Sequence, residues 1–381
     1  MDLIQLNYSL DLLLIEKILT AVLGFIVLIQ VYYFLVVFSR LAFFKVKITS
    51  TQQPGVSIIV CARNEIKNLR LHLENLLNQT YPIFQVIVVN DCSWDETELY
   101  LDVLQQHYPN LKVVTIKEQE RYQHGKKFAL SLGIKAAQYE HLLMTDADCI
   151  PDSDNWIAEM MRAYTDGKEI VLGYGGYMKE STIINKWIRF ETAFNAMQFL
   201  SYGLGGNAYM GVGRNLSYKR GLFFQNKGFA SHQHLLSGDD DLFINENATK
   251  KNVAICIAAD AITLSKPKQS WGEWFKQKKR HLSTTKYYKT RHKFSLGLFH
   301  FSQSMFYILS ILLLVFQIQL PIVAGFVTIR FLIMLLIVHG CFKRLNEKNL
   351  TLLSPFFEIV MVIAYPFVSL SSRFYRDKTW K

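Results

Sequence analysis

The fold of this chain is decided by residues 56–65, which read VSIIVCARNE. The first seven of them are mostly aliphatic or β-branched and predict a buried strand. The polar pair Asn64 and Glu65 closes the strand, and leucine then recurs at helical spacing as far as Asn78. A strand, a polar turn and a helix in this order form the repeating unit of a parallel sheet.

The same alternation continues along the chain. Apolar runs at 86–89, 111–116 and 141–145 predict three more strands, and helical patterns separate them at 95–106 and 125–137. Buried strands that alternate with helices indicate an α/β fold, a mainly parallel sheet flanked by helices on both faces. In such sheets, ligands bind beyond the carboxyl ends of the strands.

Polar side chains stand where the predicted strands end, namely Asn64, Glu65, Asp91, Asp146 and Asp148. Because these ends meet at one edge of a parallel sheet, the sequence predicts a single binding edge. The pair Asp146 and Asp148 suits a hard divalent cation shared with substrate phosphates, so we expect Mg²⁺ or Mn²⁺ there. A solvated turn is the alternative for such a pair alone, and Asp91 on an earlier strand favours the metal.

The familiar phosphate-binding loops are absent. No GxGxxG follows the first strand, which excludes the usual dinucleotide fingerprint. The segment Gly125-Lys126-Lys127 lacks both the upstream glycine and the hydroxyl residue of a P-loop. A metal ion is therefore expected to neutralise more of any bound phosphate.

A second acidic cluster, Gly238-Asp239-Asp240-Asp241, precedes an apolar helix. Acids at a helix N-terminus are favoured by capping and by the helix dipole. Capping accounts for one or two acids more easily than for three. A carboxylate here can also take a proton from an attacking hydroxyl, and both roles can hold at once.

The last polar motif is Gln277-Lys278-Lys279-Arg280-His281, within a predicted basic helix at 271–288. One interpretation is a juxtamembrane basic face that binds anionic lipid. The other is a cationic clamp on a departing diphosphate, to which the planar guanidinium of Arg280 is suited. Upstream, an aromatic helix at 182–202 either lies on the bilayer or packs on the sheet, and 209–218 predicts a strand that lines a pocket.

Composition narrows the class of protein. The chain has 381 residues, half of them hydrophobic, and a net charge of +11. Since no long basic tract is present, we expect phosphate-bearing ligands and anionic lipid as partners, and no nucleic acid. The five cysteines form no CxxC pair and are expected to be reduced residues of a cytosolic domain.

Hydrophobic segments flank the predicted domain. Residues 18–38 carry no formal charge and can span a bilayer, and Arg40, Lys45 and Lys47 after them put the next domain in the cytoplasm. Further candidate spans are 296–316, 318–342 and 352–369. Three full spans would export the basic C-terminal tail, so one segment is expected to be re-entrant or interfacial.

One of these candidate spans contains a charge, Arg330, near its middle. An arginine at that depth is a functional candidate, with a lipid phosphate as its partner. The alternative is that its side chain merely snorkels to the interface.

Taken together, the motifs resemble the family 2 glycosyltransferases, in particular membrane members such as the cellulose, chitin and hyaluronan synthases. The order is Asp91, then the DxD of Asp146 and Asp148, then an acidic pair after a glycine, then a QxxRW-like motif. Two departures matter. The family's Glu-Asp pair is here Asp239-Asp240, and its final tryptophan is His281. The second departure places processive polymerisation in doubt.

The resemblance implies a GT-A fold, with a membrane anchor at 1–47, a cytoplasmic catalytic domain at 48–293, and membrane segments with a basic tail at 294–381. It implies inverting transfer from a nucleotide sugar, UDP being favoured, to a lipid or glycan acceptor at a bacterial-type inner membrane. By motif, Asp240 is the general base with Asp239 as the fallback, and Asp146 and Asp148 hold the metal. The implied donor-binding set is Asn64, Glu65, Asp91, Lys126, Asp146, Gln277, Arg280 and His281.

Two other functions stay open on the sequence. A sugar nucleotidyltransferase uses a similar sheet and acidic metal site, but it would leave the Gly238 segment and the pair Gln277 and Arg280 without a role. A non-catalytic membrane subunit that binds nucleotide sugar would be expected to have lost acids from the set.

Overall fold

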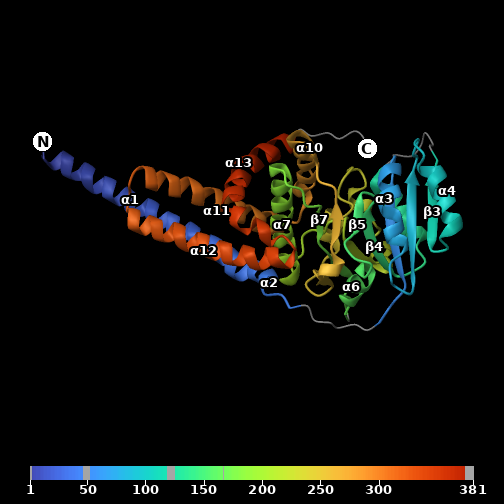
Figure 1. Cartoon of the computed structure of the whole chain (residues 1–381). Helices are drawn as coiled ribbons and strands as arrows, with labels where there is room; N and C mark the ends of the chain where they lie inside the picture. The colour runs from blue at the N-terminus through green and yellow to red at the C-terminus, as the bar shows by residue number, and fades with distance from the viewer. Residues whose placement is uncertain (1, 46–51, 118–124, 166, 374–381) are drawn as a thin grey trace.

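The computed structural model describes residues 2–45, 52–117, 125–165 and 167–373 (Figure 1). A seven-stranded sheet in the order β3-β2-β1-β4-β8-β6-β9 forms the centre of its α/β half. Only β8 runs antiparallel within this sheet, so the mainly parallel α/β prediction is confirmed. The strands are β1 Val56–Ala62, β2 Phe84–Asp91, β3 Leu111–Ile116, β4 His141–Asp146, β6 Ile170–Leu172, β8 Leu216–Lys219 and β9 Val253–Ile255.

Helices cover both faces of the sheet because side chains alternate along each strand. On one face, Ile59 and Val89 pack against α5 (Lys126–Ala136). On the other, Ile58 and Val60 pack with leucines of α3 (Ile66–Leu77) and α4 (Thr97–His107). Each fully buried aliphatic side chain contributes about 1.5–3 kcal/mol, which explains why the predicted strands contain so few polar residues.

A second sheet of three short strands joins the chain after the DxD motif to later segments. Its order is β5-β10-β7, with β5 at Cys149–Pro151, β7 at Gly175–Tyr177 and β10 at Thr263–Ser265. The remaining helices of this half are α6 Trp156–Arg162, α7 Ile183–Leu204, α8 Arg220–Gln225, α9 Asp241–Asn247 and α10 Trp271–Leu282.

The aromatic helix predicted at 182–202 is α7, and its environment is protein on nearly all sides. It lies between the sheets and the long apolar helices (Figure 1). Its rings pack on both, since Trp187 contacts Trp274 of α10 and Phe190 contacts Phe342 and Phe357 near the C-terminus. Packing, and not exposure on a bilayer surface, therefore accounts for its aromatic residues.

Two sequence expectations about element boundaries were wrong. The strand expected at 209–218 begins only at Leu216, because pairing with β4 starts with Leu216 opposite Met144, and the residues before it leave the sheet. The basic helix ends at Leu282 instead of Tyr288, because Thr284 and Tyr288 turn back to hydrogen-bond Asp241.

Among the described residues, four stretches are long and apolar enough to cross a membrane, at Leu13–Ala42, Thr290–Val315, Leu320–Arg344 and Lys348–Ser372. The first comprises most of α1 (Asp2–Tyr32), a π-helical turn η1 (Tyr33–Phe38) and α2 (Ser39–Ala42). The others are α11 (Thr290–Val315), α12 (Leu320–Arg344), and η5 (Lys348–Leu353) with α13 (Ser354–Arg373). The predicted basic tail, 374–381, lies outside the described residues.

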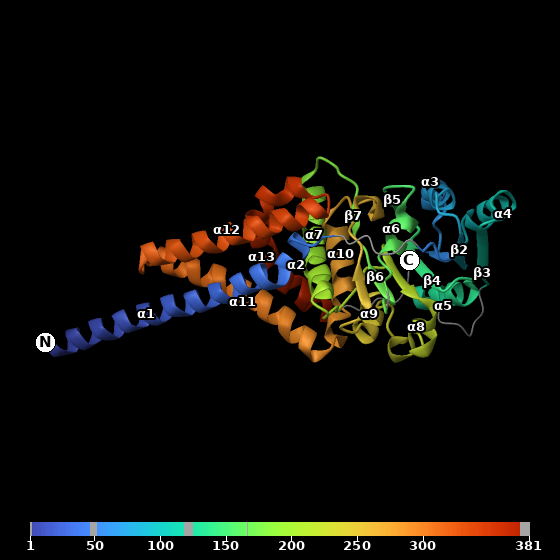
Figure 2. The ribbon, with the colours of Figure 1, turned by 90° about the horizontal axis from the view of Figure 1, so that it is seen from below.

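These helices do not form a uniform bundle. Figure 1 and Figure 2 show α1, α11 and α12 running alongside one another away from the sheets. Helix α13 instead lies at the base of this group and packs against α7 and α10. Of the four candidate spans among the described residues, α13 is therefore the one that does not run alongside the others.

Arg330 of α12 is fully buried and paired with Glu358 of α13. Its guanidinium also donates to Gln30 Oε1 of α1 at 3.0 Å, and Glu358 accepts from Gln303 and Tyr307 of α11, each at 2.6 Å. Both expectations for Arg330, a lipid phosphate and snorkelling, were wrong, because a carboxylate from another helix satisfies the charge inside the protein. The five cysteines are free thiols, as expected.

Candidate active site

The carboxyl ends of β1, β2 and β4 meet at one edge of the large sheet, as predicted. Register places Ala62 beside Asn90 and Cys61 beside Asp146. The pKa of the Cys61 thiol shows which charges lie near this edge. Burial raises this pKa, and the positive charge of Lys126 opposes the rise. Three carboxylates add to the rise, those of Asp239, Asp146 and Asp91. Residues from three separate motifs therefore act on one side chain.

Asn64 and Glu65 belong to the loop after β1, which interlocks with the loop after β2. The amide of Asn64 donates to Ser93 Oγ at 2.9 Å, and its side-chain oxygen accepts from the amide of Trp94 at 3.0 Å. Glu65 is buried and accepts from Asn68 at 2.5 Å. These contacts hold the two loops together at the edge, beside the fully buried Asp91.

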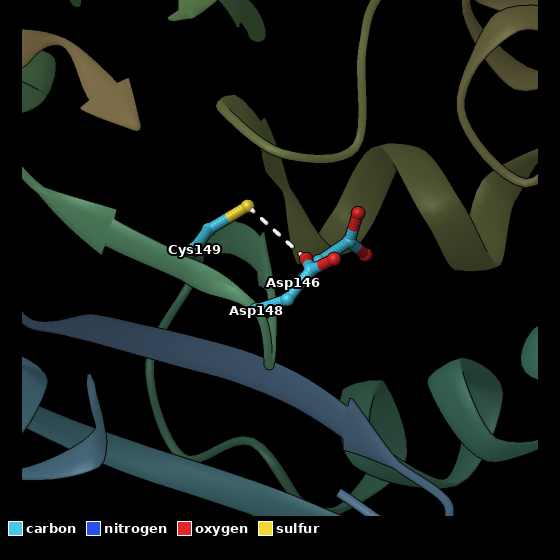
Figure 3. Close-up of side chains that lie close together, drawn as sticks. All are labelled: Asp146, Asp148 and Cys149. Carbon is cyan, nitrogen blue, oxygen red and sulfur yellow. Dashed lines mark hydrogen bonds between the residues drawn. The ribbon is translucent and has the colours of Figure 1, made fainter. Parts of the chain in front are cut away.

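The two aspartates of the DxD motif lie close together (Figure 3). Ligand atoms of Asp146, Asp148 and Cys149 lie within 4.8 Å of one another, and the Cys149 thiol donates to Asp148 Oδ1 at 3.6 Å. Burial raises the pKa of Cys149, so this thiol stays protonated and is a poor ligand. The two partly exposed carboxylates, in contrast, are the oxygen ligands that Mg²⁺ and Mn²⁺ prefer.

Lys126 joins the DxD motif to the second acidic cluster. Its Nζ lies 2.8 Å from Asp146 Oδ1 and 3.0 Å from Asp239 Oδ2, and its side chain is 22% exposed. Burial alone would lower the pKa of this lysine, but the nearby carboxylates of Asp146, Asp239 and Asp240 raise it well above its ordinary value. The ammonium is therefore a permanent positive charge among several acids.

Asp240 is the N-cap of α9, and its carboxyl group has a raised pKa. Its Oδ1 accepts from the amide of Asp241 and its Oδ2 from the amide of Gly213, both at 2.7 Å. Burial, followed by the charges of Asp239 and Asp241, raises the pKa of Asp240 to about 7, against the opposing effects of Lys126 and the Gly213 amide. A carboxylate with this pKa is suited to proton transfer near neutral pH.

Gly238 allows this arrangement. Its φ is +104°, a conformation that side chains rarely adopt, and a Cβ there would lie 2.6 Å from Leu242 Cδ1. The turn at Gly238 directs Asp239 towards Lys126 and Asp240 towards Gly213. The glycine before the acids is thus a geometric requirement of the site.

Asp241, the third acid of the cluster, has a different environment. It is buried and accepts from Thr284 Oγ1 at 2.5 Å and from Tyr288 Oη at 2.8 Å. Burial raises its pKa, and these two hydroxyls partly offset the rise. Asp241 therefore fastens the segment after α10 to the acidic turn, a role that no sequence pattern indicated.

The QxxRW-like motif lies on α10 and splits between core and cleft. Lys278 is buried with its Nζ 2.5 Å from Glu191 of α7, and Gln277 donates to Tyr177 Oη at 3.4 Å. His281 is an exposed residue at the end of α10, and desolvation by neighbouring protein, then the charges of Lys278 and Arg280, lower its pKa well below the ordinary value. Lys126 acts on His281 as well, which places the end of α10 near the acidic cluster.

Sequence reasoning missed Arg214. Its guanidinium donates to Gly176 O at 3.0 Å and to Ser265 Oγ at 2.8 Å, and it lies 4.4 Å from the ring centroid of Tyr177. Arg214 follows Gly213, whose amide contacts Asp240. The run Gly211, Gly213 and Asn215 marked this segment as pocket-lining, and the arginine inside that run was the available signal.

The large sheet, the acids at the carboxyl ends of its strands and the small second sheet together define a GT-A glycosyltransferase fold. The family model described as Glycosyl transferase family 2 matches residues 57–224, so the chain contains a family 2 glycosyltransferase domain. The predictions of the GT-A fold and of glycosyltransferase family 2 are confirmed.

Known relatives share part of this domain. A poly-beta-1,6-N-acetyl-D-glucosamine synthase of Staphylococcus epidermidis is 34% identical over 110 residues, which cover 29% of this chain and 25% of that protein. An uncharacterized glycosyltransferase of Haemophilus influenzae is 28% identical over 126 residues, 33% of this chain and 37% of that protein. The chain thus spans about a quarter to a third of the length of these curated relatives.

Among solved structures, the mannosyltransferase PcManGT from Pyrobaculum calidifontis, in complex with GDP-Man and Mn²⁺, superposes with a TM-score of 0.56. The match covers 92% of this chain and 99% of that one, at 17% sequence identity. At this identity the likeness concerns the fold, which here includes most of the described helices outside the family 2 domain.

Proposed function

We propose that this protein is a membrane-bound inverting glycosyltransferase that moves a sugar from a nucleotide sugar to a hydroxyl of a lipid or glycan. One observation carries the proposal: Lys126 contacts both Asp146 and Asp239, so the DxD motif and the acidic turn share one cleft. Asp146 and Asp239 are 93 positions apart in sequence. Their convergence beside Asp240 supplies a donor side and an acceptor side in a single site.

Donor binding is assigned to the sheet edge. Asn64 and Glu65 lie in the loop after β1, and Asp91 is the last residue of β2, and a uridine is expected at this edge. Asp146 and Asp148 would hold a divalent cation, Mg²⁺ or Mn²⁺, whose chemistry there is to neutralise charge on the leaving diphosphate. UDP-sugars are the first donors to test, since curated relatives include poly-beta-1,6-N-acetyl-D-glucosamine synthases.

Asp240 acts on the acceptor as the general base. The acceptor hydroxyl gives its proton to the Asp240 carboxylate while its oxygen bonds to the anomeric carbon of the sugar. The bond from that carbon to the diphosphate oxygen breaks, and the diphosphate leaves with the electron pair. Lys126 and the cationic end of α10, with Gln277 and Arg280, stabilise the leaving side.

The first experiment is nucleotide release by the purified full chain in detergent, with UDP- and GDP-sugars and Mn²⁺ or Mg²⁺. Asp240→Asn removes the base and keeps the shape, so turnover should fall by at least about 10²-fold while donor binding persists. Asp239→Asn tests the fallback base and should lose far less. An Asp240→Asn variant that turns over like the wild type would refute the assignment.

Stability provides the control for that variant. Because folding raises the pKa of Asp240 to about 7, its ionised form destabilises the fold, and this effect grows as pH rises from about 4 to about 7. Asp240→Asn removes this cost but loses one of the two oxygens that accept from the amides of Asp241 and Gly213, so its unfolding temperature at pH 8 is expected to stay close to that of the wild type. Loss of activity without loss of stability separates catalysis from misfolding.

For the membrane, we propose that α1, α11 and α12 span the bilayer and that α13 lies in the interface. The packing of α13 on α10 and α7 supports this arrangement, and three spans leave the basic tail on the cytoplasmic side with the catalytic domain. On this topology we also propose the division into 1–47, 48–293 and 294–381, at a bacterial-type inner membrane. Accessibility of cysteines introduced at Lys67 and Gln317 to a membrane-impermeant reagent tests it, since they should label from opposite sides.

A further inference from the structure

A second cavity, apart from the cleft of Lys126 and Asp240, lies where the catalytic domain meets the helix bundle. Its volume is about 330 Å³, within the range of small-ligand sites. One wall is β7 and β10 of the small sheet, with Tyr174, Tyr177 and Leu264, and the other is the turn after α12, with Asn346 and Glu347. The cavity therefore opens at the level where a membrane-held acceptor would approach the domain.

One wall of this cavity leads directly to the reaction edge. The hydroxyl of Tyr177 contacts Gln277, and its ring carries the guanidinium of Arg214 at 4.4 Å. Arg214 follows Gly213, whose amide donates to Asp240. Tyr177 thus links the lining of the cavity, through Arg214 and Gly213, to the segment that contacts the proposed base.

The cavity contains a buried polar group that lacks a partner. Tyr174 is 2% exposed, and its hydroxyl has no hydrogen-bond partner among the residues that the structure describes. Burial raises the pKa of Tyr174 well above its ordinary value, so the group is a neutral phenol able to donate and accept. Buried hydroxyls are normally hydrogen-bonded, so this one points to a ligand or ordered water.

The cavity is lined by four aliphatic or thioether side chains, Met178, Ile262, Leu264 and Leu345, together with polar groups that suit a hydroxyl-rich ligand. Asp152 and Lys179 are among the polar groups, and Lys179 Nζ lies 3.4 Å from Asn346 Oδ1. Glu347 is already paired with Arg189, so the cavity contains no uncompensated buried charge. Two tyrosine rings with an acid, an amine and an amide around them offer both donors and acceptors, as the hydroxyls of a sugar require.

We propose that this cavity binds a saccharide unit of the acceptor and so defines the acceptor as a glycan or glycan-bearing lipid. The proposal rests on the glycosyltransferase function above and adds the acceptor class and its site. The binding unit lies beyond the sugar that receives the transfer, because Asp240 lines the separate cleft with Lys126 and not this cavity.

Binding of a defined probe tests the site without relying on turnover. Saturation-transfer NMR would use the full chain in detergent with UDP and a β-1,6-linked N-acetylglucosamine disaccharide. Tyr174→Phe removes only the hydroxyl, and the disaccharide should bind about fivefold more weakly, the value of one net hydrogen bond. Tyr81→Phe is the matched control, because that buried hydroxyl donates to Pro54 O outside the cavity, and it should leave binding unchanged.

A second variant guards against misfolding of the first. Asn346 has φ +59° in an exposed turn, so Asn346→Gly keeps the backbone conformation and removes the amide. It should weaken disaccharide binding in the same direction. Equal binding by the wild type and both variants, or no saturation transfer to the wild type, would overturn the proposal and leave a water-filled seam.

Nucleotide release separates this proposal from the function on which it rests. Tyr174→Phe should release nucleotide from the donor at the wild-type rate when no acceptor is present, and raise only the apparent KM for the acceptor. If the wild-type protein binds the disaccharide through Tyr174 but turns over no donor, the saccharide site is supported and the glycosyltransferase function is refuted. If turnover is normal but disaccharide binding does not depend on Tyr174, the glycosyltransferase function is supported and the saccharide site is refuted.

Discussion

Two clusters of charge, one in the cleft and one among the long helices, follow opposite rules. In the helix cluster, Arg330 and Glu358 are fully buried, their charges balance, and each carboxylate oxygen of Glu358 accepts two hydrogen bonds. In the cleft, one ammonium, Lys126, stands among Asp146, Asp239 and Asp240. The first cluster neutralises its own charge, although Arg330 Nε has no hydrogen-bond partner among the described residues, whereas the second carries excess negative charge that suits a cation and a charged substrate.

The contrast teaches how to distinguish structural from chemical charge in such a protein. A structural pair in a dry environment needs an opposite charge in direct contact, because an unpaired charge there costs several kcal/mol. A catalytic group needs a perturbed pKa and partial access, as Asp240 has. The four predictions below test this contrast, from the largest expected effect to the smallest.

Breaking the helix cluster should have the largest effect on stability. Glu358→Ala leaves Arg330 buried without its partner and should lower the free energy of unfolding by about 3–5 kcal/mol. Thermal unfolding in detergent measures it. The double variant Arg330→Met, Glu358→Leu removes both charges and should stay close to the wild type. A single variant as stable as the double variant would contradict the balance proposed for this cluster.

Removing the cation of the cleft should affect chemistry instead. Lys126→Met leaves three carboxylates without their shared ammonium, and kcat/KM should fall by about 10²-fold, as for other charge-stabilising groups. Steady-state kinetics provide the measurement, with whichever UDP- or GDP-sugar the nucleotide-release experiment identifies as the donor. Lys135→Met, on the exposed side of the same helix, should be inert. Similar losses in both variants would mean that α5, and not the ammonium, had been disturbed.

The acid limb of the pH–rate profile sharpens the assignment of Asp240. A base acts when deprotonated, so the rate should rise with pH and level off above about 7. The negative charge of Asp239 raises the pKa of Asp240, and Asp239→Asn should therefore move this limb to lower pH, by about one unit. A limb that stays in place or moves to higher pH would show that another group controls the profile.

The smallest expected effect concerns the tie between α10 and the acidic turn. Thr284→Val removes the hydroxyl that donates to buried Asp241, while Tyr288 still donates, so stability should fall by about 1 kcal/mol. Chemical denaturation measures the change. Ser283→Ala, which removes a bond within α10 only, is the comparison. Equal losses would indicate general weakening of the helix end.

The sequence predicted the sheet well where burial repeats along the chain. The strands at 56–62 and 111–116 lie where expected, since an apolar run between polar turns has few other solutions. Prediction was poorer at 209–218, where glycines and a short antiparallel pairing replace the regular pattern. There, the path of the chain depends on contacts with β4 and with Asp240 that local sequence does not encode.

By itself, the sequence determined the alternating α/β order, the acids at the strand ends and the apolar segments, because each depends on side chains near one another in the chain. Only the tertiary structure decided which acids share Lys126, that Asp241 is a fastening residue, and that Arg330 pairs with Glu358. These are pairings between distant segments. Their energies depend on distance and burial, and both arise only when the helices and sheets pack together.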